Sequence, residues 1–89
     1  MEKIYYETAK VVGNNIKTLR KAYGFTQQDL ADLSGLGRRT ICNYEAGKSL
    51  PNMECVCKLC KTFNIKVGVL FNENLKVSTK HEVKVTIKI

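Results

Sequence analysis

The segment from residue 25 to residue 35 constrains the fold most, because it carries the start and stop signals of one short helix. Thr26 can cap the helix by accepting a hydrogen bond from a free amide of the first turn. Asp29, three residues later, can bond back to the cap and complete a capping box. Gly35 can adopt the left-handed conformation that ends many helices. We therefore predict a helix that starts after Thr26 and stops at Gly35. Its buried stripe is expected to comprise Leu30, Ala31 and Leu33.

A second short helix is expected over residues 38 to 46, directly after a glycine turn. At about 100° per residue, Ile41 and Tyr44 fall on one side, where they can pack on the rest of the domain. The opposite arc carries Arg38, Arg39, Cys42, Asn43 and Ala46. Guanidinium and carboxamide groups make the paired hydrogen bonds that distinguish guanine and adenine edges in the major groove. Two short helices joined by such a turn predict a helix-turn-helix DNA reader rather than a solvated charged surface.

Residues 12 to 71 resemble the phage Cro/repressor family of helix-turn-helix proteins, also called the xenobiotic-response-element family. The residues that carry the resemblance are Ile16, Leu19, Arg20, Lys21, Gly24, Phe25, Thr26, Gln27, Leu30, Ala31, Leu33, Ile41, Tyr44, Glu45, Gly47, Lys48 and Pro51. Several are polar residues at fixed offsets, which makes the motif specific. The resemblance implies a lambda-repressor-like domain of five helices that binds double-stranded DNA and regulates transcription.

The resemblance also implies roles for individual residues. The base-reading positions are Arg38, Arg39 and Asn43. The residues assigned to the DNA backbone are Gln27, Thr40 and Lys48. Arg20 and Glu45 are expected to form an ion pair between the first and third helices. Gly37 departs from the family, which commonly has Ser or Thr at this N-cap, so we expect a weaker cap on the recognition helix.

The rest of the chain up to residue 71 predicts further helices and an all-α fold. Apolar residues that recur at steps of three and four indicate a first helix. They are Tyr5, Ala9, Val12, Ile16, Leu19 and Tyr23. Gly13 costs about 1 kcal/mol relative to alanine, which leaves open a helix start near Asn14. A fourth helix is expected over residues 52 to 62 and a fifth around residues 67 to 71. The inward positions of the fourth are expected to be Met53, Val56, Cys57, Cys60 and Phe63.

Fifteen basic and eight acidic residues give the 89-residue chain a net charge of +7, which suits a polyanionic partner. At this length we expect one domain, residues 1–71, followed by a C-terminal element, residues 72–89. No apolar run is long enough to span a bilayer, and no charged start precedes an apolar block. We therefore expect a cytoplasmic protein with no membrane contact, whose four cysteines are reduced.

Cys55, Cys57 and Cys60 invite a metal site, but the first two point about 200° apart on a helix. We therefore expect no metal, and nothing in the chain calls for a cofactor. The single histidine, His81, lies in another segment. Because no acid, base and nucleophile occur together as a set, we do not expect an enzyme.

Residues 75 to 89 alternate between two kinds of side chain without a slip. The odd positions are Leu75, Val77, Thr79, His81, Val83, Val85, Ile87 and Ile89. This pattern predicts a strand with one apolar face, and a lone strand cannot satisfy its backbone. The simplest partner is the same strand of a second molecule, which would make Val83, Val85, Ile87 and Ile89 dimerisation residues. A hairpin with a loop over residues 80 to 82 also keeps the faces matched, and a disordered basic tail is a third alternative.

Together these features predict a sequence-specific DNA-binding transcriptional regulator. We expect a repressor that binds a palindromic operator as a homodimer. The alternative is an antitoxin or interaction subunit of a toxin–antitoxin-type complex that also binds DNA, with the C-terminal strand added to the partner's sheet.

Overall fold

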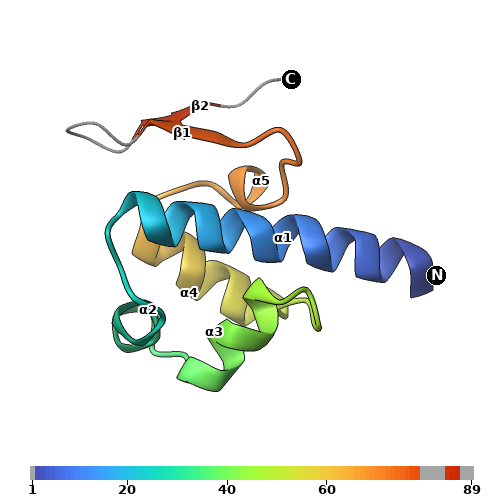
Figure 1. The fold of residues 1–89 in the computed structure, drawn as a ribbon, viewed down its shortest axis with the longest axis horizontal. Coiled ribbons are helices and arrows are strands. Elements are labelled where there is room, and N and C mark those ends of the chain that lie inside the picture. The colour runs from blue at the N-terminus through green and yellow to red at the C-terminus, as the bar shows by residue number, and fades with distance from the viewer. Residues whose placement is uncertain (1, 79–83, 87–89) are drawn as a thin grey trace.

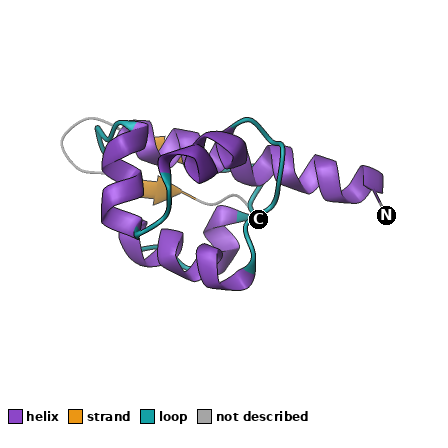
Figure 2. Ribbon diagram, turned by 90° about the horizontal axis from the view of Figure 1, so that it is seen from below, coloured by secondary structure: helices purple, strands orange, loops and turns teal. Residues whose placement is uncertain are grey.

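The computed structural model describes residues 2–78 and 84–86 of the chain. The helices are α1 (Glu2–Ala22), α2 (Gln27–Ser34), α3 (Arg38–Glu45), α4 (Met53–Phe63) and α5 (Val67–Leu70), and the strands are β1 (Lys76–Ser78) and β2 (Lys84–Thr86). Figure 1 shows α1 across the middle of the molecule, with α2 and α3 on one side and the strands on the other. In Figure 2, viewed from the side of α2 and α3, the strands lie behind the helices. The expected fold of five helices is confirmed. Within the described ranges, every helix is too short or too polar to cross a membrane.

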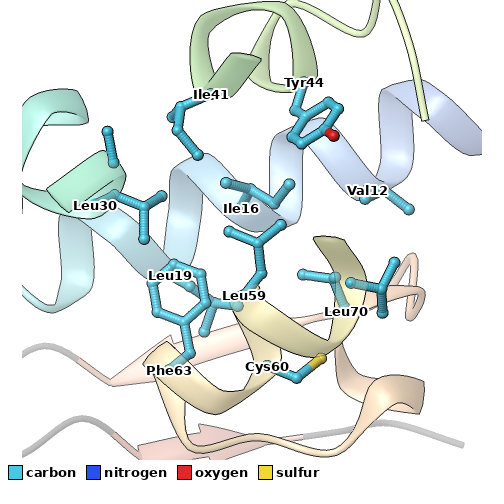
Figure 3. Close-up of a cluster of buried hydrophobic side chains, with 12 residues drawn as sticks. Val12, Ile16, Leu19, Leu30, Ile41, Tyr44, Leu59, Cys60, Phe63 and Leu70 are labelled. Atoms are coloured by element: carbon cyan, nitrogen blue, oxygen red, sulfur yellow. The ribbon is translucent and has the colours of Figure 1, made fainter. Parts of the chain in front are cut away.

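The hydrophobic core takes side chains from all five helices and lies around one face of α1 (Figure 3). Its buried members are Val12, Ile16, Leu19, Leu30, Ala31, Ile41, Tyr44, Val56, Leu59, Cys60, Phe63 and Leu70. Because α2 and α3 contribute to the same core as α1 and α4, burial of apolar surface holds the pair of short helices in a fixed position.

Gly13 does not interrupt the first helix, so a helix start near Asn14 is wrong. The helix runs unbroken through Gly13, which is buried. A Cβ atom built on Gly13 would overlap the carbonyl oxygen of Tyr44 and lie 3.1 Å from its carbonyl carbon. The glycine therefore permits the close approach of α1 to the C-terminal end of α3, and this contact outweighs its low helix propensity.

The start and stop of α2 follow the sequence signals. Thr26 and Asp29 form the capping box, with the Asp29 amide 3.0 Å from the Thr26 hydroxyl and the Thr26 amide 2.9 Å from the Asp29 carboxylate. Gly35 ends the helix in the left-handed region, at φ 76°. The buried stripe was partly wrong, because Leu33 is 59% exposed and Ser34 is buried in its place. Ser34 follows Leu30 by four residues and shares its face, whereas Leu33 lies at the edge of that arc.

Helix α4 also differs from the expected pattern. Asn52 caps it by accepting from the amide of Cys55 at 2.9 Å. Two of the expected inward positions point outward, since Met53 is 61% exposed and Cys57 is exposed. Leu59, which was not expected to face inward, is fully buried. The buried residues are Val56, Leu59, Cys60 and Phe63. These four residues have the i, i+3, i+4, i+7 spacing of a single buried stripe. Cys57 follows Val56 directly and therefore lies outside this stripe.

The C-terminal strands pair with each other inside one chain. β1 and β2 are antiparallel, with Val77 opposite Val85 and Ser78 opposite Lys84. This register matches odd positions with odd, as the hairpin alternative requires. Along this edge, β1 therefore pairs with β2 of the same chain, as in the hairpin alternative, and not with the strand of a second molecule. Closing a short loop costs less entropy than bringing two molecules together. Of the expected dimerisation residues, Val83, Ile87 and Ile89 lie outside the described residues.

Candidate nucleic-acid interface

Helix α3 is held by one face and leaves the other open. Ile41 and Tyr44 are buried in the core, as their spacing predicted. Burial raises the pKa of the Tyr44 phenol, so this side chain stays neutral where it packs. Gly37 begins α3 without a side-chain cap, which is the weaker start expected for it. The first turn of α3 is thus free of side-chain capping and faces solvent with its two arginines.

The residues assigned to DNA occupy α3, its following loop and the start of α2. Arg38, Arg39 and Lys48 are exposed, and Gln27, Thr40 and Asn43 are half-buried. The amide of Lys48 donates to the carbonyl of Asn43 at 3.0 Å, which ties the loop to the end of α3. An open cleft at the start of α2 is lined by Arg20, Gly24, Phe25, Thr26, Gln27, Gln28 and Arg38. Gln27 and Arg38, distant in sequence, therefore share one cleft.

An ion pair joins α1 to α3 behind this surface. Arg20 Nε donates to Glu45 Oε2 at 2.6 Å, and Arg20 Nη2 donates to Glu45 Oε1 at 3.0 Å. Arg20 Nη1 donates to the carbonyl of Phe25 at 2.8 Å. Only 11% of the Arg20 side chain and 4% of the Glu45 side chain are exposed. The pair that the resemblance implied is thus present, nearly buried, and also fixes the turn before α2.

The carboxamide of Gln27 is held at both ends by protein atoms. Gln27 Nε2 donates to Glu45 Oε1 at 3.2 Å. Gln27 Oε1 accepts from the thiol of Cys42, with a sulfur–oxygen distance of 2.9 Å. Sequence reasoning placed Cys42 on the open arc of α3 but did not find this contact. Nothing in the sequence pairs the two residues, because they belong to different helices.

The chain is similar to proteins of a known family. Residues 16–70 match the family described as helix-turn-helix. The chain belongs to this family. It is 33% identical over 58 residues to the uncharacterized HTH-type transcriptional regulator YgzD of Bacillus subtilis, covering 65% of this chain and 88% of the relative. The restriction-modification controller protein C.AhdI of Aeromonas hydrophila has the same fold, with a TM-score of 0.68 and 32% identity over 71% of this chain and 96% of that one.

A longer relative is the antitoxin PezA of Streptococcus pneumoniae. It is 30% identical over 79 residues, which are 89% of this chain. The chain spans only half the length of that antitoxin. These comparisons make the chain a helix-turn-helix, DNA-binding transcriptional regulator of the xenobiotic-response-element type.

In helix-turn-helix proteins, residues at the start of the second helix of the motif contact base edges in the major groove. In this helix-turn-helix domain that helix is α3, and Arg38 and Arg39 open it. Arg38 and Arg39 therefore lie in the first turn of the second helix of the motif. The capping-box partner Asp29 lies on α2, where its hydrogen bonds from the backbone and side chain of Thr26 lower the pKa of the carboxyl group.

The cysteines of the helix-turn-helix domain take different environments. Cys60 is buried and Cys57 is exposed, while Cys42 and Cys55 are half-buried. Burial raises the pKa of the Cys60 thiol, which packs as a small apolar group. Over residues 2–78 and 84–86, no three His, Cys, Asp or Glu side chains come together as a metal site.

Proposed function

We propose that this helix-turn-helix regulator is a repressor that binds a palindromic operator as a homodimer. The observation that carries the proposal is the exposed first turn of α3, where Arg38 and Arg39 face solvent and Arg38 lines the open cleft at the start of α2. Arginine can bond both acceptors of guanine, and Asn43 one turn later can bond adenine in the same way. The net charge of +7 supports attraction to the phosphate backbone.

The division between base and backbone contacts follows from chemistry and position. Arg38, Arg39 and Asn43 are proposed to read bases, because they lie along the open arc of α3. A second set is proposed to contact the backbone, and it comprises Gln27, Thr40 and Lys48. Phosphate contacts set the register of a protein on DNA but carry no sequence information.

Selection from random duplexes tests the proposal. The full chain should enrich an inverted repeat whose half-sites are centred about 10 base pairs apart, or a multiple of that, with two chains bound per duplex. Enrichment of a single asymmetric half-site with one chain bound would contradict the homodimer. No enrichment at all would contradict sequence-specific binding.

Arg38→Ala should lose affinity for the selected operator by about 1–3 kcal/mol and relax the base preference, because a bidentate contact to a base is removed. Lys48→Ala is the matched control. It should weaken binding to all duplexes alike and lower the salt slope by roughly one unit. Titrations of both variants on the operator and on an unrelated duplex measure the difference. An unchanged base preference in Arg38→Ala would contradict the assignment of base reading to α3.

We infer that residues 72–89 form the dimerisation element. Strands β1 and β2 lie across α1 from α3 (Figure 1). A two-fold axis that runs from the hairpin side toward the α3 side would therefore place both α3 helices on one face of the dimer, with the hairpins away from DNA. One edge of each described strand is used inside the chain, so an outer edge would have to join the two copies.

A chain that ends at Asn74 tests this element. It should stay folded, because the buried members of the core all lie between Val12 and Leu70. Of the removed residues whose burial is described, Leu75 packs at the core's edge and Lys76 is exposed. Sedimentation should show a monomer, and binding to the full operator should be much weaker. A stable dimer of the truncated chain would assign the interface to the helices instead.

The second candidate function is an antitoxin that also binds DNA. The match to PezA favours it, because it extends over 79 residues, whereas the helix-turn-helix match covers residues 16–70. In that case the hairpin would add its edge to the sheet of a toxin. Co-expression with the product of a neighbouring reading frame separates the two functions. A stable complex that suppresses that product's toxicity would support the antitoxin, and its absence would leave the homodimeric repressor.

A further inference from the structure

Four side chains form a continuous chain of hydrogen bonds across α1, α2 and α3. Arg20 donates to Glu45, Glu45 accepts from Gln27, and Gln27 accepts from Cys42. The first link is an ion pair with both partners nearly buried. The last link is the thiol of Cys42, a half-buried residue of α3. Gln27 thus lies between a rigid anchor and a cysteine of the recognition helix.

These contacts fix the direction of the Gln27 carboxamide. A carboxamide has one oxygen and two N–H donors. The oxygen accepts from Cys42 at 2.9 Å and one N–H donates to Glu45 at 3.2 Å. A reversed amide would set its oxygen against the carboxylate of Glu45 and its NH₂ group against the thiol. Because only one of the two N–H groups donates to Glu45, the other remains for a ligand. Gln27 lines the open cleft together with Arg38.

We propose that Cys42 is a positioning residue for DNA binding, which holds the Gln27 carboxamide so that its second N–H is ready for a DNA phosphate. The proposal rests on the proposed function, because that function brings a phosphate to Gln27. Without the thiol, Gln27 keeps its bond to Glu45 but loses the restraint on its oxygen. Binding must then immobilise the side chain, which lowers affinity.

Cys42→Ser and Cys42→Ala separate positioning from packing. Serine keeps a donor at this position and alanine does not. On the duplex selected by the wild-type chain, Cys42→Ser should bind like wild type and Cys42→Ala should bind roughly three- to tenfold more weakly, the value of one ordinary hydrogen bond. The factor should be the same on an unrelated duplex, because a phosphate contact is blind to sequence. Cys57→Ala, at an exposed cysteine of α4, is the matched control and should change nothing.

A double-mutant cycle tests the route through Gln27. In a Gln27→Ala background, Cys42→Ala should have no further effect on binding. The side-chain NH₂ resonances of Gln27 should shift in unbound Cys42→Ala and stay in place in Cys57→Ala, which reports positioning even where stability changes. Wild-type affinity in Cys42→Ala, or an equal loss in the Gln27→Ala background, would overturn the proposal while leaving the proposed function intact. If the wild-type chain selects no duplex, both fail together.

Discussion

Gly13→Ala should destabilise the domain by about 3 kcal/mol or more, although the same change inside an ordinary helix stabilises by about 1 kcal/mol. The added methyl group would overlap the carbonyl oxygen of Tyr44 and approach the carbonyl oxygen of Glu45 to 3.3 Å. Both are backbone atoms of α3 that cannot move without shifting the recognition helix. Urea unfolding at a fixed temperature measures the loss directly.

Gly68→Ala is the matched control for this prediction. Gly68 lies in α5, and a Cβ atom there has open space around it. This variant should unfold at the same urea concentration as wild type or at a slightly higher one. If Gly13→Ala were as stable as Gly68→Ala, the close approach of α1 and α3 would be wrong.

Glu45→Ala should lower the free energy of unfolding by about 3–5 kcal/mol, because it leaves the guanidinium of Arg20 nearly buried without its charge partner. The same change removes the acceptor of Gln27. The decrease in the free energy of unfolding should therefore be several times larger than for an ordinary surface substitution. Thermal unfolding of the variant measures it.

Glu54→Ala is the matched control for the ion pair. Its carboxylate lies 3.7 Å from the amine of Lys58, and 44% of the Lys58 side chain and 72% of the Glu54 side chain are exposed. Exposed pairs of this kind contribute about 0–1 kcal/mol. Equal melting temperatures for Glu45→Ala and Glu54→Ala would show that the Arg20–Glu45 pair does not stabilise the fold.

The sequence by itself determined the elements whose signals are local. Thr26, Asp29 and Gly35 act within single turns, so the start and stop of α2 could be predicted without any knowledge of the fold. The spacing of Ile41 and Tyr44 likewise predicted which side of α3 is buried. The family's fixed polar offsets pointed to Arg20 and Glu45, which the structure joins across 25 positions of the chain.

The tertiary structure alone decided whatever depends on a partner from another element. From the sequence, Gly13 could be judged only by its low helix propensity. Its close neighbour in the structure, the carbonyl of Tyr44, belongs to a different helix. Asn15 is buried on α1, and its amide donates to the carbonyls of Leu70 and Asn72 at 2.8 Å, which no local pattern indicates. The bond between Cys42 and Gln27 is of the same kind.

The pairing of the C-terminal strand shows most clearly what a sequence pattern cannot determine. Strict alternation predicts a strand and its apolar face, because side chains alternate along any extended backbone. It does not choose the strand that accepts the hydrogen bonds, since a hairpin and a paired twin present the same pattern. Only folding brought Val77 opposite Val85 in one chain. Helix ends and strand faces depend on a few adjacent residues, whereas strand pairing and close packing depend on contacts between residues that are distant in the sequence.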